Sequence, residues 1–202
     1  MRLLCGVVAA LVLLASAPTV LARAVWTTNS VRVYDYTSAA WRPVVAATVE
    51  EINAILPAKA PSLFYRVIGE TPCDQIDPQL HRDGIVVCTT PALASADELG
   101  LTEFFVERGQ ISRVRITLSE EFDPTLRDNI VCHEFMHAIT GIRDNYGALP
   151  DTSCVWGNLN APGSFDAQYV RKLYKDKDTS SGGKKHGGKR HGGKKHGGRH
   201  GR

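Results

Sequence analysis

The chain has 202 residues, of which 43% are hydrophobic, and its formal net charge is +3. Its apolar run near the N-terminus, Leu3 to Leu14, is shorter than the ~20 residues that a membrane-spanning helix needs, so we expect no transmembrane segment. The charge is unevenly distributed along the chain. Residues 180–202 contain eight Lys or Arg and no acid, and the first 24 residues contain two more Arg. The body between them therefore has 14 Lys or Arg against all 21 Asp and Glu, a net charge of about −7.

The first 24 residues have the pattern of a secretory signal peptide. Arg2 supplies a positive charge, an apolar run follows, and the segment ends in the small-residue pattern Ala22-Arg23-Ala24. We expect cleavage after Ala24 and a secreted protein, extracellular or periplasmic. A membrane anchor at this end is the alternative.

Residues 25–175 have the size of one domain with a single core. Alternating apolar residues predict strands, and apolar residues three or four apart predict helices. We expect strands at 31–34, 63–68, 84–88 and 111–118, and helices at 40–56, from Pro124 to about Thr140, and at 164–174. Asp123 is expected to cap the second helix, and Gly141 is expected to end it. This order predicts an α+β domain in which a mixed sheet packs on helices.

Four cysteines remain once Cys5 leaves with the signal, and they are Cys73, Cys88, Cys132 and Cys154. An even number in a secreted chain predicts two disulfides. Three pairings are possible, and we favour Cys73 with Cys88 and Cys132 with Cys154 because each closes a short local loop. Zinc ligation by these thiols is the alternative, and it is weaker because none forms a Cys-x-x-Cys pair.

The segment His133-Glu134-Phe135-Met136-His137 carries the clearest chemistry. Histidines at i and i+4 lie on one face of a helix and can reach a single metal ion. Glu134 lies on an adjacent sector, where it can act as general base towards a zinc-activated water in peptide hydrolysis. The alternative is a helix that carries two histidines by chance. The expected cap, the apolar lead-in and the glycine turn favour the zinc site.

A catalytic zinc needs three protein ligands and one open position. Asp144 is the candidate for the third ligand, because Gly141 lets the chain fold back and Asp144 follows soon afterwards. In the alternative, Asp144 only makes a loop turn. Asp151 and Asp166 are then the substitutes.

The stretch HEFMHAITGIRDNY resembles the extended zinc motif of the metzincin peptidases, especially small secreted members of the snapalysin group. SFDAQYVRKLY is similar to the closing helix of the matrixin branch. The resemblance implies a zincin-like domain and an edge strand that pairs with an extended substrate, a role the 111–118 strand could fill. Tyr146 could stabilise the oxyanion, or could be an ordinary packed aromatic.

The sequence departs from the metzincin pattern at two points. One extra residue precedes Gly141, and the only methionines are Met1 and Met136, neither of them in the turn beneath the metal where the family has one. The resemblance implies that Val155 or a neighbour takes that place, pinned to the zinc helix by a Cys132–Cys154 disulfide.

Residues 176–202 form a Lys, Arg, His and Gly repeat that contains no core-forming side chain, so we expect a disordered tail. The sequence as a whole predicts a secreted, monomeric zinc metalloendopeptidase that binds Zn²⁺ and a protein or peptide substrate. One alternative is a catalytically degenerate zincin. The other is a protein whose tail binds anionic polymers or metal ions.

Overall fold

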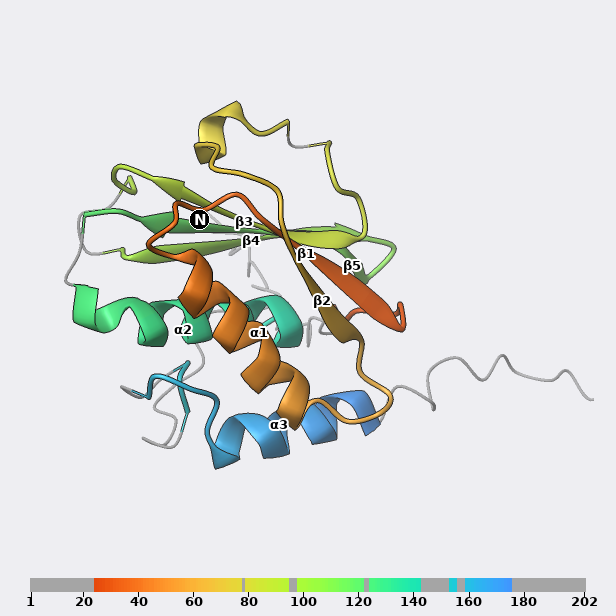
Figure 1. The fold of residues 1–202 in the computed structure, drawn as a ribbon. Coiled ribbons are helices and arrows are strands. Elements are labelled where there is room, and N and C mark those ends of the chain that lie inside the picture. Colours follow the sequence, from red (N-terminus) through yellow and green to blue (C-terminus); the bar gives the residue numbers. More distant parts are fainter. Residues whose placement is uncertain are drawn as a thin grey trace, which may run out of the picture.

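The computed structural model describes residues 24–77, 79–94, 98–121, 124–142, 153–155 and 159–175. The predicted signal segment up to residue 23 and the predicted tail lie outside these ranges. The described residues form an α+β unit, as predicted, in which the helices lie on one side of a five-stranded sheet (Figure 1). The strands are β1 (Ser30–Asp35), β2 (Ser62–Val67), β3 (Gly84–Thr90), β4 (Gly100–Glu107) and β5 (Gln110–Ser119), and the helices are α1 (Arg42–Ile55), α2 (Arg127–Thr140) and α3 (Ser164–Lys175).

The sheet is mixed, with the strand order β2-β1-β3-β5-β4. Four strands are parallel to their neighbours, and β4 pairs antiparallel with β5 at one edge. The prediction that the 111–118 strand lies at the edge is therefore wrong, because β5 is enclosed between β3 and β4. The edge strand is β4, which the sequence analysis did not identify.

The main core lies between the sheet and the helices. In α1 the buried residues Val45, Thr48, Val49 and Ile52 follow the helical spacing of three and four, so one stripe of the helix faces the sheet. Asn53 fixes α1 to the start of β2, because its side-chain amide accepts from the Leu63 N–H at 2.8 Å and donates to the Leu63 carbonyl at 2.9 Å. Pro57 follows the helix end, as predicted.

The start of α2 differs from the prediction. Pro124–Leu126 form a 3₁₀ turn, α2 begins at Arg127, and Leu126 at the cap position makes no side-chain capping bond. The predicted cap Asp123 lies outside the described residues, and the helix begins three residues later than the proline signal indicated. The turn of 3₁₀ helix lets the chain enter α2 without a side-chain cap, and Asp128 places a negative charge in the first α-helical turn.

The other face of the sheet carries the segment between β2 and β3, which includes the 3₁₀ helix η1 (Cys73–Gln75) (Figure 1). The predicted disulfide between Cys73 and Cys88 is confirmed and ties this segment to β3. A second, smaller core forms beneath it from Tyr34, Tyr36, Cys73, Ile76, Val86 and Cys88. The sheet is thus covered on both faces, by helices on one and by a disulfide-bound loop on the other.

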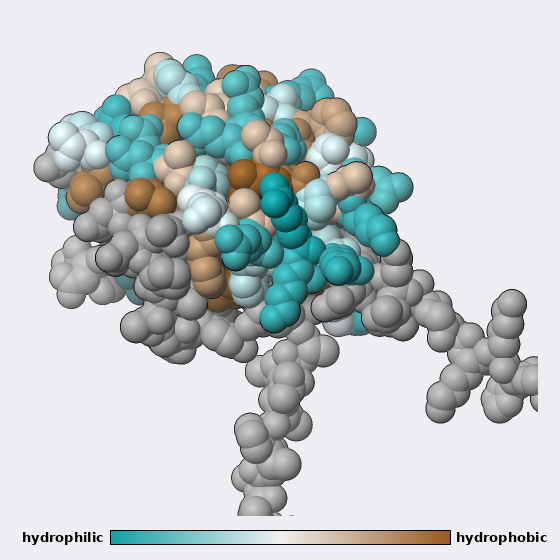
Figure 2. All heavy atoms as spheres, turned by 90° about the horizontal axis from the view of Figure 1, so that it is seen from below, coloured by the Kyte–Doolittle hydropathy of each residue, from teal (hydrophilic) through white to brown (hydrophobic). Residues whose placement is uncertain are grey.

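The helix α3 closes the molecule below α1 and α2 (Figure 1). It buries Asp166, Val170 and Tyr174, whereas Arg171 and Lys172 are exposed. The described surface on this side has hydrophilic side chains gathered over its middle and hydrophobic ones in small separate groups (Figure 2). In the part of the chain that the structure describes, no helix combines the length and the apolar character that crossing a membrane requires.

Candidate functional site

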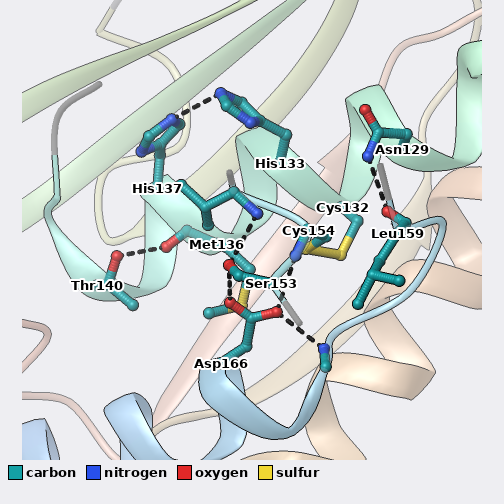
Figure 3. Close-up of a disulfide and its surroundings, with 12 residues drawn as sticks. Asn129, Cys132, His133, Met136, His137, Thr140, Ser153, Cys154, Leu159 and Asp166 are labelled. Carbon is teal, nitrogen blue, oxygen red and sulfur yellow. Dashed lines mark hydrogen bonds between the residues drawn. A yellow bond between two sulfur atoms is a disulfide. The ribbon is translucent and has the colours of Figure 1, made fainter. Parts of the chain in front are cut away.

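The helix α2 places His133 and His137 on one face, as the i and i+4 spacing predicts. Their rings meet edge to face with centroids 4.5 Å apart. The two Nε2 atoms are 2.9 Å apart, so both point to one region of space (Figure 3). Two nitrogens bound at ~2.0–2.1 Å to one tetrahedral zinc lie about 3.3 Å apart, a few tenths of an ångström more than this spacing. A small rotation of either ring would accommodate the ion.

The backbone fixes the orientation of the second histidine. The Nδ1 of His137 lies 2.8 Å from the carbonyl oxygen of Ile142. Because a carbonyl only accepts, Nδ1 carries the proton in the neutral ring, and the lone pair is on Nε2. A metal-binding histidine needs its lone pair on the ligating nitrogen and a partner for the other nitrogen, and His137 meets both conditions. The pair therefore fits a zinc ion.

In the C-terminal turn of α2, which carries His137, the carbonyls of residues 136–139 all accept hydrogen bonds. Helix ends leave their last carbonyls without helical partners, so this turn needs outside donors. The bonds run from Thr140 Oγ1 to Met136 at 2.6 Å, from Gly141 N to His137 at 2.9 Å, from Trp26 Nε1 to Ala138 at 2.8 Å and from Tyr174 Oη to Ile139 at 2.9 Å. Burial raises the pKa of Tyr174, which keeps its hydroxyl protonated as a donor. The turn is thus held from both ends of the described chain.

Gly141 ends the helix as predicted. It has a φ of 64°, in the left-handed region where glycine carries no steric penalty. A Cβ at this position would lie 2.5 Å from the carbonyl oxygen of Ala24, so the glycine also makes room for the chain before β1. The sequence has one more residue between His137 and Gly141 than the metzincin pattern. The helix α2 includes this extra residue, because it continues to Thr140.

Glu134 is held against the edge strand. Its side chain is 5% exposed, and its Oε2 accepts a hydrogen bond from Thr102 Oγ1 at 2.5 Å. The same hydroxyl lies 3.1 Å from the Glu134 carbonyl oxygen. Gly100 approaches from the same strand, since a Cβ there would lie 2.6 Å from Glu134 Oε1. Two residues of β4 therefore fix the position of the carboxylate.

A cleft of about 290 Å³ opens beside these groups. It is lined by Glu98, Leu99, Gly100, Asn129, Ile130, His133 and Glu134. The residues come from the start of β4 on one side and from α2 on the other. The candidate base and one candidate ligand thus border a space that a substrate can enter.

The segment Ser153–Val155 is attached to α2 and α3 (Figure 3). The predicted Cys132–Cys154 disulfide is confirmed, and it joins the segment to the residue before His133. Asp166 accepts hydrogen bonds from Ser153 Oγ at 2.5 Å, Cys154 N at 3.0 Å and Gly163 N at 2.8 Å. Asp166 is therefore wrong as a substitute metal ligand, because its carboxylate is occupied in anchoring this segment.

The remaining predicted site residues, Asp144, Tyr146 and Asp151, lie outside the described residues. Within the described ranges, no three His, Cys, Asp or Glu side chains are grouped as a metal site. Asp144 as third ligand and Tyr146 as oxyanion donor stay predictions. So does the assignment of Val155, which is buried in the core, to the place of the metzincin methionine.

Comparisons with known proteins were made for the whole chain. No family model matches it, and no curated protein matches it. The assignment of a function therefore depends on the residues and their geometry.

Several residues of the site were not identified from the sequence. Thr102 and Gly100 lie in the strand that was missed, and Trp26 and Tyr174 are far from the zinc motif in the sequence. The sequence did contain an indication of the strand that carries Thr102. Thr102 and Phe104 alternate with Leu101 and Glu103 in an apolar-rich stretch, a pattern typical of a strand. The aromatic donors carried no signal of their own, since only the fold brings them to the end of α2.

Proposed function

We propose that this protein is a secreted zinc-dependent endopeptidase. The observation that carries the proposal is the convergence of the Nε2 atoms of His133 and His137, 2.9 Å apart, beside a cleft that also borders the Glu134 carboxylate. His133, His137 and the predicted third ligand Asp144 would hold the ion. When bound, zinc supplies a positive charge that polarises a peptide carbonyl and makes a water molecule more acidic.

The chain's own residues would carry out the proton transfers. Glu134 accepts a proton from the attacking water and passes it to the leaving amine. Thr102 holds the carboxylate in place by its hydrogen bond, so that little reorganisation is needed during the reaction. The fixed C-terminal turn of α2 holds His137 in the same way.

The edge strand β4 suits an extended substrate. Its outer side pairs with no strand in the described part of the chain and can form main-chain hydrogen bonds with a peptide, and its first residues line the cleft. We therefore assign to β4 the substrate-pairing role that was expected of the 111–118 strand. A peptide on this edge would pass Gly100 and Thr102, next to Glu134.

Replacing Thr102 with Val should lower kcat by about 10- to 100-fold, because a hydrogen bond to a charged group contributes ~1.5–3 kcal/mol. KM and zinc content should change little, since the substitution conserves shape and touches neither histidine. Stopped assays on a quenched fluorescent peptide would measure kcat and KM separately. Thr102→Ser restores the hydroxyl and should recover most of the rate. Equal activity of the Val variant and the wild type would contradict a positioning role.

Removal of the metal tests the proposal itself. Dialysis of the mature chain against a chelator should abolish casein cleavage, and one equivalent of Zn²⁺ should restore it. Zinc bound per chain and cleavage rate are measured on the same samples, with Mg²⁺ addition as the control. Zinc binding without cleavage would favour the degenerate zincin, and cleavage that survives complete zinc removal would overturn the proposal.

A separate prediction concerns residues 176–202. Their repeated Lys, Arg and His suit anionic polymers, whereas the body of the chain carries a net negative charge. Binding through this segment is compatible with peptidase activity and would be lost at high salt.

A further inference from the structure

Arg113 is a buried cation on the face of the sheet opposite the helices. Along β5, Arg113 and Arg115 alternate with Val114 and Ile116, which face the main core, and Arg113 is 8% exposed. Its guanidinium lies over the ring of Phe105, its cross-strand partner in β4, 3.7 Å from the ring centroid. Stacking of this kind holds the guanidinium plane while its N–H groups remain directed outward along the edges.

The guanidinium of Arg113 has no hydrogen bond or ion pair with any residue that the structure describes. Its neighbour Arg115, two residues along the same face, donates to Glu103 at 2.8 Å. A guanidinium has five N–H donors and no acceptor. None of the Arg113 nitrogens is among the fully buried side-chain atoms that lack a partner, so its N–H groups reach the solvent and are open to a ligand. The two arginines therefore differ in one respect that matters, since Arg115 has its counter-ion and Arg113 has none among these residues.

The surrounding charges do not compensate for this. Burial is the main cause that lowers the pKa of Arg113, and repulsion by Arg115 and Arg82 lowers it further. Asp77 and Glu103 act in the opposite direction, as weaker influences. At Arg113 the repulsion by the two arginines thus exceeds the attraction by these two carboxylates.

Arg113 borders a cavity of about 570 Å³. The cavity lies between the β4–β5 hairpin and the end of the loop that follows η1, where Arg82 stands at its rim. Asp83 and Glu107 also lie at the rim, and both are exposed, as Arg82 is, so solvent screens all three of these charges. The buried guanidinium at the base has the stronger influence on what the cavity accepts.

We propose that this cavity binds an oxyanion group, a carboxylate, sulfate or phosphate, with Arg113 as the principal contact and Arg82 as a second contact at the rim. The planar fork of Arg113 can donate two parallel hydrogen bonds to such a group, and the Phe105 ring beneath it holds the fork in position to do so. The site is separate from the histidine pair, because it lies on the opposite face of the sheet. It does not depend on the proposed peptidase activity.

Calorimetric titration of the mature chain with sodium sulfate, phosphate and succinate, at constant ionic strength, tests the proposal. At least one should bind saturably and raise the Tm by about 5 °C when present at ~100 times its Kd. Preference for succinate would identify a carboxylate ligand, and preference for sulfate or phosphate a tetrahedral one. No saturable binding by any of the three would overturn the proposal.

Three variants locate the site. Arg113→Met should weaken binding at least tenfold, whereas Arg115→Met, the matched control, should retain it within about threefold. Arg113→Lys keeps the charge and loses the fork, so binding should be intermediate. Unchanged affinity in both Arg113 variants would place the anion elsewhere and refute the assignment.

Discussion

Replacement of Glu134 by Gln is expected to reduce kcat/KM for peptide cleavage by about 10³-fold or more while zinc remains bound. General base catalysis contributes ~10²–10⁴-fold, and an amide cannot accept the proton of the attacking water. The substitution conserves size, and the amide oxygen can still accept the hydrogen bond from Thr102. The histidines are untouched. The loss should therefore appear in the chemical step and not in metal binding.

Zinc content by atomic absorption and cleavage of a fluorogenic peptide are the two measurements. Glu103→Gln is the matched control, because it makes the same change in β4, next to Thr102, at a carboxylate that pairs with Arg115. That control should keep nearly full activity. Loss of zinc from the Glu134 variant would make Glu134 a ligand, and retention of full activity would remove it from the mechanism.

The parts of the fold that the sequence predicted are those with strong local signals. The parallel strands β1, β3 and β5 carry buried Val and Ile at alternate positions, and α1 has a helical apolar stripe. The disulfide pairs were predicted from loop length alone, and Gly141 marks the end of α2 because glycine adopts its φ without a steric penalty. In each case a short range of sequence determines the outcome.

The parts that were missed depend on tertiary contacts. The edge strand β4 leaves Leu101 39% and Val106 50% exposed, so its alternation is weaker than that of a strand with one fully buried face. The start of α2 was placed too early because Pro124 fits the first turn of a 3₁₀ helix as well as that of an α-helix. Asp166 as a ligand was wrong because Ser153 Oγ and Cys154 N, from a segment 12 and 13 residues earlier in the chain, occupy its carboxylate.

The same distinction applies to the candidate site. The sequence predicted His133, Glu134 and His137, because all three lie on one helix and their spacing determines which face they share. Thr102 beside Glu134, and the two aromatic donors at the end of α2, come from elements that approach α2 only in the folded chain. Reactive groups are thus easier to predict from sequence than the residues that hold them in position.

Replacing Asp166 with Ala is expected to destabilise the protein by about 3–5 kcal/mol, the range for removing one partner of a buried charged hydrogen-bond network. The carboxylate is 1% exposed and accepts three hydrogen bonds, so its loss leaves Ser153 Oγ and the Cys154 and Gly163 N–H groups without their acceptor. The bond to Gly163 also closes the first turn of α3, because an acid at the third helical position reaches back to the residue before the helix.

Urea denaturation under non-reducing conditions measures the effect, with the Cys132–Cys154 disulfide intact in all variants. Asp74→Ala is the control, because Asp74 lies exposed in η1 and its loss should change stability by less than about 0.5 kcal/mol. Ser153→Ala removes one hydrogen-bond donor to Asp166, so its loss of unfolding free energy should lie between those of Asp166→Ala and Asp74→Ala. Since the disulfide joins this segment to the residue before His133, the Asp166 variant should also bind zinc more weakly. A variant with wild-type stability would show that the segment is held by the disulfide alone.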